Sequence, residues 1–249
     1  MKIHYKSPAE IEKLRKAGKI VAEILDLLSE NVRPGVTTKE LDDLAAEFFA
    51  KSKASAAFLG YQGFPANICV SVDDEVVHGI PGDKVLETGQ IVSVDVGSIV
   101  EGYYGDSART FAVGEIDDKA QNLLDVTKES LFKGIEACIT NNYLGDISAA
   151  IQTFSENEGY SVVRDLVGHG IGTRMHEEPQ VPNFGEQGTG IKLKEGLVIA
   201  IEPMINAGGH QVKVRPDGWT IVTSDGSLSA HFEHTVAITS NGPEILTLG

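Results

Sequence analysis

The spacing of apolar residues predicts helices in two separate parts of the chain. In residues 7–31, apolar positions from Ile11 to Leu28 follow helical periodicity behind a Ser-Pro-Ala-Glu capping box. A second helix is expected at about 38–52, with a capping box at 37–40 and an apolar face made of Leu41, Leu44 and Phe48. The same periodicity returns at roughly 117–139 and 145–157.

Strand patterns follow each pair of helices. The expected strands are ANICVSV, IVSVDVGS and GYYGDSARTFAV in the first half, then YSVVRDL, GLVIAIEPMI, WTIVTSD, SAHFEHTVAIT and EILTL. Each half therefore runs helix, helix, strands, although neither repeats the residues of the other. This order favours one α+β domain over residues 1–249, built from two similar halves. Two unrelated subdomains are the alternative that the pattern leaves open.

Composition excludes some classes of protein. The formal net charge is −15, from 21 basic and 36 acidic residues, which argues against a general binder of nucleic acid or of anionic membranes. The two cysteines, Cys69 and Cys138, have no spacing typical of a zinc ribbon or a disulfide framework. The first 16 residues show no apolar signal core, and no apolar run approaches a membrane span. We therefore expect a cytoplasmic protein.

The stretch LVGHGIGTRMHEEPQVPN, at 166–183, combines two histidines with three alternating glycines. The glycines disfavour a helix, since each costs ~1 kcal/mol relative to alanine in a helix interior. A straight strand would place His169 and His176 on opposite faces, because they are an odd number of residues apart. The chain must therefore bend here or approach another group closely.

Two aspartates lie in strands where charge is unexpected. If the strands around Asp95 and Asp106 form a hairpin that turns near Val100-Glu101, the two carboxylates face each other directly. Such a pair needs a proton or a cation between its members, and Arg109 is the nearby cationic side chain. The alternative is a different register, in which one aspartate points to solvent.

Glu202, after GLVIAI, and Glu233, in SAHFEHTVAI, repeat this anomaly. Charged residues are rarely buried unless they are paired or bind a metal. Four carboxylates and His169 exceed the ligand set of one catalytic zinc and suit two divalent ions ~3.5–4 Å apart, as in hydrolases. A single six-coordinate structural ion is the alternative.

Five blocks of the sequence together resemble the type I methionine aminopeptidases. They are VDDEVVHGIP, VDVGSIVEGYYGDSARTF, VGHGIGTRMHEEP, AIEPMI and SAHFEHTV, and their order and spacing match as well. The resemblance implies the α+β pita-bread fold, in which two pseudo-symmetric αβ halves surround a curved antiparallel sheet. It also implies metalloenzyme activity that removes the N-terminal methionine of peptides and nascent chains, with a preference for a small second residue.

Carried over position by position, the resemblance implies two divalent ions, of Co, Mn, Fe or Zn, that hold the attacking hydroxide. Asp106 and Glu233 would bridge them. His78 and His176 would be catalytic histidines that are not ligands, and Glu202 would also move a proton. Without the resemblance, both histidines would be ordinary loop or core residues. The implied metal ligands are Asp95, Asp106, His169, Glu202 and Glu233.

The resemblance also implies a methionine pocket formed by Tyr61, Phe64, Cys69 and Trp219, for which ordinary core packing is the alternative. Three residues depart from the common pattern of the family. Met175 and Phe58 would change the wall of the methionine pocket. Asp73 stands where asparagine is usual and would alter a monovalent-ion site near His78.

Other functions remain open at this point. A prolidase or proline aminopeptidase would share the fold and the metals, and an inactive relative could bind peptides only. A structural metal protein would not require His78 and His176. Regarding partners, we expect a monomer that contacts the ribosome transiently.

Overall fold

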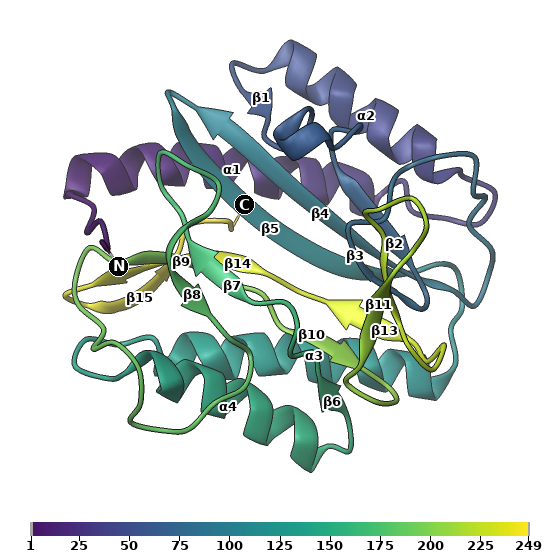
Figure 1. The fold of residues 1–249 in the computed structure, drawn as a ribbon. Coiled ribbons are helices and arrows are strands. Elements are labelled where there is room, and N and C mark those ends of the chain that lie inside the picture. The colour runs from purple at the N-terminus through teal and green to yellow at the C-terminus, as the bar shows by residue number, and fades with distance from the viewer. Residues whose placement is uncertain (1, 249) are drawn as a thin grey trace.

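The computed structural model of the chain, which describes residues 2–248, contains the four predicted helices in the predicted order (Figure 1). The helices are α1 (Pro8–Ser29), α2 (Thr38–Lys51), α3 (Asp118–Ala137) and α4 (Leu144–Asn157). Each end lies within two residues of the predicted one. Both predicted capping boxes form, since the side chains of Ser7 and Thr37 accept from the backbone N–H of the third helical residue.

The buried face of α2 is shifted by one residue from the prediction. Leu41 is fully buried, but Ala45 and Phe49 complete the face, while Leu44 and Phe48 are only partly buried. The sequence offers adjacent apolar residues at 44–45 and 48–49, so periodicity alone does not decide between the two faces.

The strands form four antiparallel sheets within the described residues. The orders are β1-β4-β2 with β5 beside β4, then β15-β14-β9-β7-β8, β13-β10-β6 and β11-β12-β3. In the first half the strands are β1 (Ser55–Ala56), β2 (Cys69–Val72), β3 (Glu75–Val77), β4 (Ile91–Val100) and β5 (Tyr103–Ala112). In the second half they are β6 (Ser161–Val162), β7 (Gly168–Gly170), β8 (Glu177–Val181), β9 (Val198–Ile201), β10 (Met204–Asn206), β11 (Val212–Val214), β12 (Ile221–Thr223), β13 (Ser229–His231), β14 (His234–Thr239) and β15 (Gly242–Ile245).

Two strands that were predicted to be continuous are interrupted at acidic residues. The first breaks at Glu202-Pro203, between β9 and β10, where proline has no N–H for a sheet hydrogen bond. The second breaks at Phe232-Glu233, between β13 and β14. At these breaks the orientation of the glutamate side chains does not follow the alternation of a regular strand. It is set by the local backbone conformation at each position.

A seam of hydrogen bonds joins the two halves along β5. Thr235 Oγ1 donates to the Asp106 carbonyl at 2.8 Å, and the Asp106 N–H donates back to Thr235 Oγ1 at 3.2 Å. The Glu233 N–H donates to the carbonyl of Ala108 at 2.9 Å. The seam therefore brings Asp106, from the first half, beside Glu233, from the second.

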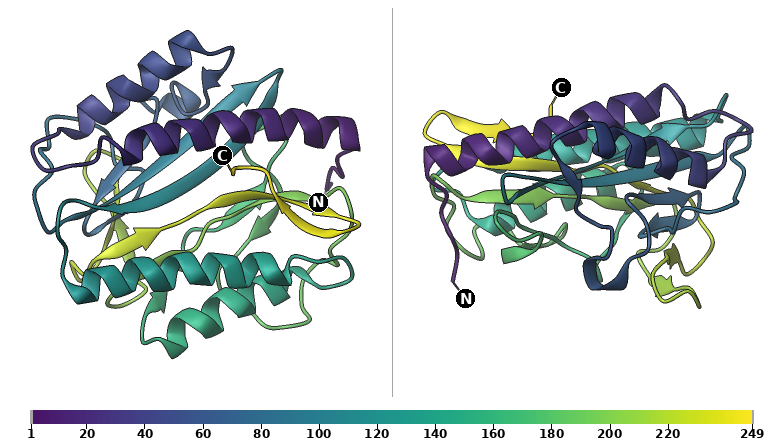
Figure 2. Two further views of the ribbon diagram at one scale, coloured as in Figure 1. Left: turned by 180° about the vertical axis from the view of Figure 1, so that it is seen from behind. Right: turned by 90° about the horizontal axis from the view of Figure 1, so that it is seen from above.

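All four helices cover one face of the sheets (Figure 2). Val92, Val94 and Val96 of β4 point toward α1 and α2, where they are buried in an apolar core. Because side chains alternate along a strand, Asp95 points to the opposite face. The helices thus cover the apolar face of β4, and the Asp95 side chain lies on the face that they do not cover.

The register of the β4–β5 hairpin corrects the prediction for its two aspartates. The hairpin turns at Glu101-Gly102, both with positive φ, so Asp95 pairs with Ala108 and Asp106 pairs with Gly97. The carboxylates are therefore diagonal neighbours on one face and do not stand directly opposite each other. The centre of the turn lies one residue further along the chain than predicted, and the shared face is preserved.

Candidate active site

All eleven residues predicted for the site line a single cavity of about 170 Å³. They come from both halves of the chain and are widely separated in the sequence. Three further residues, Phe58, Gln62 and Met175, also line it. The lining residues, all within the described part of the chain, include no lysine or arginine. The predicted residues are Tyr61, Phe64, Cys69, His78, Asp95, Asp106, His169, His176, Glu202, Trp219 and Glu233.

The orientation of the His169 ring is determined by its backbone. Nδ1 lies 2.9 Å from the carbonyl oxygen of Gly170, which can only accept, so Nδ1 carries the proton. Nε2 then presents a lone pair 3.6 Å from Asp106 Oδ2 and 3.6 Å from Glu202 Oε1. The flanking glycines permit this position, because a Cβ on Gly168 or Gly170 would lie 2.4 Å or 2.3 Å from a neighbouring carbonyl oxygen.

Four carboxyl groups, those of Asp95, Asp106, Glu202 and Glu233, lie close together in the cavity, so their negative charges repel one another. Burial, followed by the charge of Asp106, raises the pKa of Asp95 well above its ordinary value. Burial and the neighbouring carboxylates likewise raise the pKa of Glu202 and of Glu233, and burial raises that of Asp106. As free groups, these side chains would therefore take up protons that ordinary carboxylates lack at neutral pH.

Two more histidines face the same cavity. Burial, followed by the neighbouring histidine, lowers the pKa of both His78 and His176 to about 4, so both rings are neutral at pH 7. Tyr61 Oη lies 2.7 Å from Nδ1 of His176. His78 has a positive φ of 60°, an uncommon conformation for a residue other than glycine and one that concentrates at functional sites.

An apolar cluster forms the other wall of the cavity. Phe58, Phe64, Cys69 and Met175 are buried in it, with Tyr61 and Trp219 packed against them. Phe64 and Trp219 meet edge to face, with ring centroids 5.2 Å apart. The cluster gives this wall aromatic rings and sulfur atoms, which make favourable contacts with one another and with a thioether group.

Several residues noted in the sequence lie outside the cavity lining. Arg109 pairs with Asp26 at 2.6 Å and does not neutralise the acidic cluster. Asp73 accepts hydrogen bonds from the backbone of Ile91 and the side chain of Gln90. Glu177 is buried in an ion pair with Lys6.

One residue beside the site was missed. His231 is fully buried, its Nε2 lies 3.9 Å from Glu202 Oε2, and neither ring nitrogen has a hydrogen-bond partner among the described residues. The signal that could have revealed it was a histidine in the apolar stretch SAHFEHTVAI, two residues before Glu233 and at the end of β13.

The donor groups fit divalent metal ions. Ligand atoms of Asp106, His169 and Glu233 lie within 4.8 Å of one another. Asp95 Oδ1, Asp106 Oδ1 and Glu233 Oε1 are buried without a hydrogen-bond partner in the described chain, which is unfavourable for carboxylate oxygens unless a cation binds them. Together with the His169 lone pair, these oxygens are a hard and borderline ligand set.

Comparisons with known proteins agree with this geometry. Residues 12–240 match the profile of metallopeptidase family M24. The chain is 57% identical to a methionine aminopeptidase of Clostridium acetobutylicum, over 98% of each chain. The crystal structure of methionine aminopeptidase from Thermotoga maritima superposes with a TM-score of 0.98, at 49% identity and over 100% of each chain.

The fold is shared more widely than the sequence. Prolidase from Pyrococcus furiosus superposes with a TM-score of 0.77 at 23% identity, and the match covers 98% of this chain and 65% of that one. Likeness at this level shows the fold alone, which is the predicted pita-bread fold. The match to the family profile and the close, full-length relatives together show that this chain belongs to the methionine aminopeptidases of metallopeptidase family M24.

Proposed function

We propose that this methionine aminopeptidase hydrolyses the first peptide bond of its substrate with two divalent ions held by the acidic cluster. Asp95, Asp106, His169, Glu202 and Glu233 would be the ligands, with Asp106 and Glu233 shared between the ions. When bound, such ions lower the pKa of a coordinated water toward ~7 and so supply hydroxide near neutral pH. Co, Mn, Fe and Zn all suit these nitrogen and oxygen donors.

His176 and His78 act on the scissile amide in this proposal. Both are neutral at pH 7, so a ring N–H of each can donate to the substrate without a fixed positive charge. With the Tyr61 hydroxyl donating to Nδ1 of His176, Nε2 carries the proton and can stabilise a developing oxyanion. The Glu202 carboxylate lies beside the reacting groups, where it would accept a proton from the attacking water and transfer that proton to the leaving amine.

The apolar wall selects the first residue of the substrate. Tyr61, Phe64, Cys69 and Trp219 surround the methionine side chain, and sulfur–aromatic contacts of ~0.3–1.5 kcal/mol favour a thioether there. Phe58 and Met175 extend the same wall. A preference for a small second residue is proposed from the family resemblance.

The observation that carries the proposal is the single orientation of His169. Its Nδ1–H donates to a carbonyl, so the Nε2 lone pair faces the carboxyl groups of Asp106 and Glu202, an arrangement that a divalent cation would satisfy. The test is to strip the protein with a chelator and reload it with one or two equivalents of each metal. We expect binding of two ions by calorimetry and metal-dependent cleavage of Met-Ala-Ser.

Two outcomes would contradict the proposal. Cleavage of Xaa-Pro peptides in place of Met-Ala-Ser would assign a prolidase-like activity. Retention of full cleavage by a metal-free His169→Ala variant would show that the cluster is not the metal centre. His210→Ala is the matched control, because His210 lies outside the cavity lining.

Four further points are part of the proposal. We propose that residues 1–249 act as one catalytic domain, because the cavity takes residues from both halves. No helix among the described residues is long and apolar enough to cross a membrane. A cytoplasmic location, a transient ribosome contact and a monomeric state stay predictions, and analytical ultracentrifugation tests the last of them.

A further inference from the structure

A buried ion pair connects the N-terminal segment to the histidine loop. Lys6 Nζ lies 2.8 Å from Glu177 Oε2, although the residues are 171 positions apart in the sequence. Their side chains are only 1% and 5% exposed. In each of the other ion pairs between a lysine or arginine and a carboxylate distant in the sequence, among residues 2–248, at least one side chain is 36% or more exposed, as in Lys84–Glu75 at 43% and 6%. This pair is therefore the most deeply buried contact of its kind in the described chain.

The second oxygen of Glu177 holds the turn that precedes it. Glu177 Oε1 accepts from the backbone N–H groups of Thr173 and Arg174, at 3.0 Å and 3.2 Å. Burial alone would raise the pKa of Glu177, but the hydrogen bond and charge of Lys6, together with these N–H groups, hold it below its ordinary value. One carboxylate thus links Lys6 to the backbone of 173–177.

The packing around this carboxylate leaves little freedom. A Cβ on Gly172 would lie 2.6 Å from Glu177 Oε1 and 2.7 Å from Lys6 Cε. The Lys6 N–H also donates to the Gly196 carbonyl at 2.6 Å, which fixes the segment just before α1. A Cβ at position 172 would therefore displace the side chain of Lys6 or Glu177.

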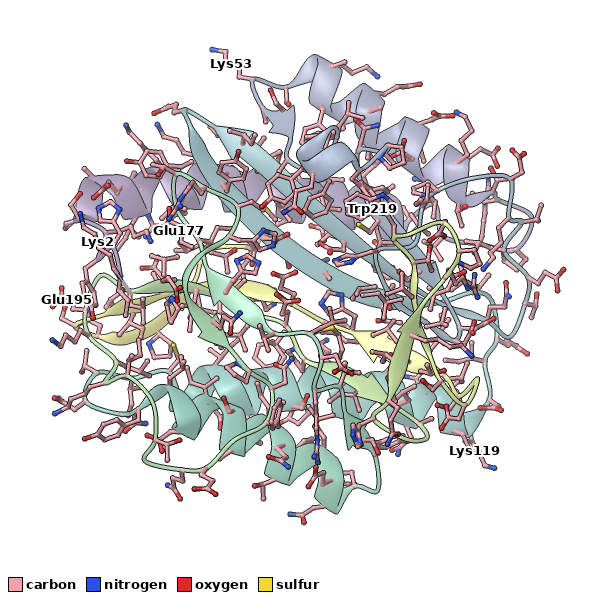
Figure 3. All side chains as sticks on the ribbon, viewed as in Figure 1. Lys2, Lys53, Lys119, Glu177, Glu195 and Trp219 are labelled. Atoms are coloured by element: carbon pink, nitrogen blue, oxygen red, sulfur yellow. The ribbon has the colours of Figure 1, made fainter. Side chains whose placement is uncertain are left out.

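The same turn supplies two groups to the active-site cavity. Met175 and His176 line the cavity, and the ring of His176 lies 4.3 Å from that of His169 between centroids. Glu177 is the next residue and turns toward the N-terminal segment. Figure 3 shows Glu177 at the same end of the molecule as Lys2, with Trp219 toward the opposite end.

We propose that Lys6 is a positioning residue: its ion pair with Glu177 fixes the 173–177 turn and thereby the place of the His176 ring in the cavity. This inference deepens the proposed function, since it concerns a histidine to which that function gives a role. It requires no contact between Lys6 and substrate or metal. A small displacement of a catalytic group lowers the reaction rate strongly, so a more mobile 173–177 turn should lower kcat.

The test replaces the lysine with an uncharged side chain of similar length, Lys6→Met. We expect kcat for Met-Ala-Ser to fall on the order of tenfold to a hundredfold, while the affinity for Zn²⁺ measured by calorimetry stays within about twofold. The ring ¹⁵N resonances of His176, assigned with a His176→Gln sample, should shift or broaden in the metal-free, substrate-free protein. These resonances report the ring directly and do not depend on activity.

Two control variants separate positioning from general stability. Leu131→Ala, in the core beneath α3 and α4, should lower the melting temperature without changing kcat or the His176 resonances. The double variant Lys6→Met/Glu177→Gln removes the unpaired buried charge but keeps an acceptor for the two N–H groups, so it should fold even where Lys6→Met does not. Its His176 resonances should also differ from those of the wild type.

The inference is overturned if the folded single or double variant keeps wild-type His176 resonances and kcat and loses only stability, as Leu131→Ala does. Equal losses of Zn²⁺ affinity and turnover would overturn it too, because they would show general damage to the site. If the wild-type chain fails to cleave Met-Ala-Ser but the resonances move in the variants, the proposed function fails and the positioning role stands.

Discussion

Tyr61 has two contacts with different consequences for the reaction. Its ring packs against the apolar cluster, whereas its hydroxyl reaches Nδ1 of His176 at 2.7 Å. In the proposed function the ring would contribute to binding of the methionine side chain, and the hydroxyl would favour one tautomer of the histidine. A change that removes only the hydroxyl therefore separates the two roles.

Tyr61→Phe should lower kcat roughly twofold to tenfold and leave KM for Met-Ala-Ser almost unchanged, since a neutral hydrogen bond contributes ~0.5–1.5 kcal/mol. Steady-state kinetics measure both constants. Tyr104→Phe is the matched control, because Tyr104 packs against the same cluster and should leave both constants unchanged. A rise in KM with constant kcat would show that the hydroxyl serves binding alone.

At the level of elements, α1 lies unusually close to β5. A Cβ on Gly105 would lie 2.6 Å from the Gly18 nitrogen, and one on Gly18 would lie 2.1 Å from the Leu246 carbonyl oxygen. The glycine at 105 permits the approach of β5 to α1, and the glycine at 18 permits the approach of the Leu246 carbonyl to the same helix. The result is that the backbone next to Asp106 rests directly on the helix, so packing of an element determines the position of a proposed ligand.

Gly105→Ala should therefore destabilise the protein by ~1–3 kcal/mol, the usual effect of overpacking, and weaken Zn²⁺ binding. Urea denaturation and calorimetry measure the two effects. Gly82→Ala is the control, because Gly82 has open space around it and no positive φ, so both quantities should stay at wild-type values. Unchanged Zn²⁺ affinity in Gly105→Ala would show that β5 can shift without moving Asp106.

The sequence predicted the elements well where the signals are local. Capping boxes and apolar spacing located the helices, and misplaced acidic residues located the proposed ligands before any fold was known. The turn of the aspartate hairpin was predicted one residue too early, so the pairing register was wrong by two residues, because a turn at 101–102 with two positive φ angles is not distinguished from its neighbours by pattern alone. The contacts Tyr61–His176 and Lys6–Glu177 join distant segments, and nothing in either local sequence reports them.

At the scale of the whole molecule, the acidic cluster couples stability to pH and to metal. The pKa of Asp106 is raised to about 8 in the folded chain, and those of Asp95, Glu202 and Glu233 are raised as well. The folded, metal-free chain therefore holds protons that the unfolded chain has released above pH ~5. Its free energy of unfolding must fall as pH rises toward the folded pKa.

Melting temperatures at several pH values test this coupling. Between about pH 7 and pH 8 the site histidines His169 and His176, with pKa values lowered to about 4, are neutral in the folded chain and only a minority of them is protonated in the unfolded chain. Their opposing effect on the slope is smaller than that of the four carboxyl groups, so the metal-free protein should lose stability as pH rises. Added Mn²⁺ or Zn²⁺ should restore it, and by more at pH 8 than at pH 7, because the ligands bind metal in their deprotonated form. A metal-free melting temperature that rises through this interval would contradict the proposed burial of the cluster.

The hydrogen-bonded seam along β5 and β14 joins the two halves of the chain, so cutting the chain between them should separate the parts of the active site. Each half of the chain carries helices and a sheet, yet the cavity takes carboxylates from both. Neither half by itself therefore carries all the proposed ligands. A chain cut between Ala112 and Asp118 should have no aminopeptidase activity until its two fragments associate. Activity would therefore depend on the packing of the two halves against each other along this seam as much as on the stability of either half.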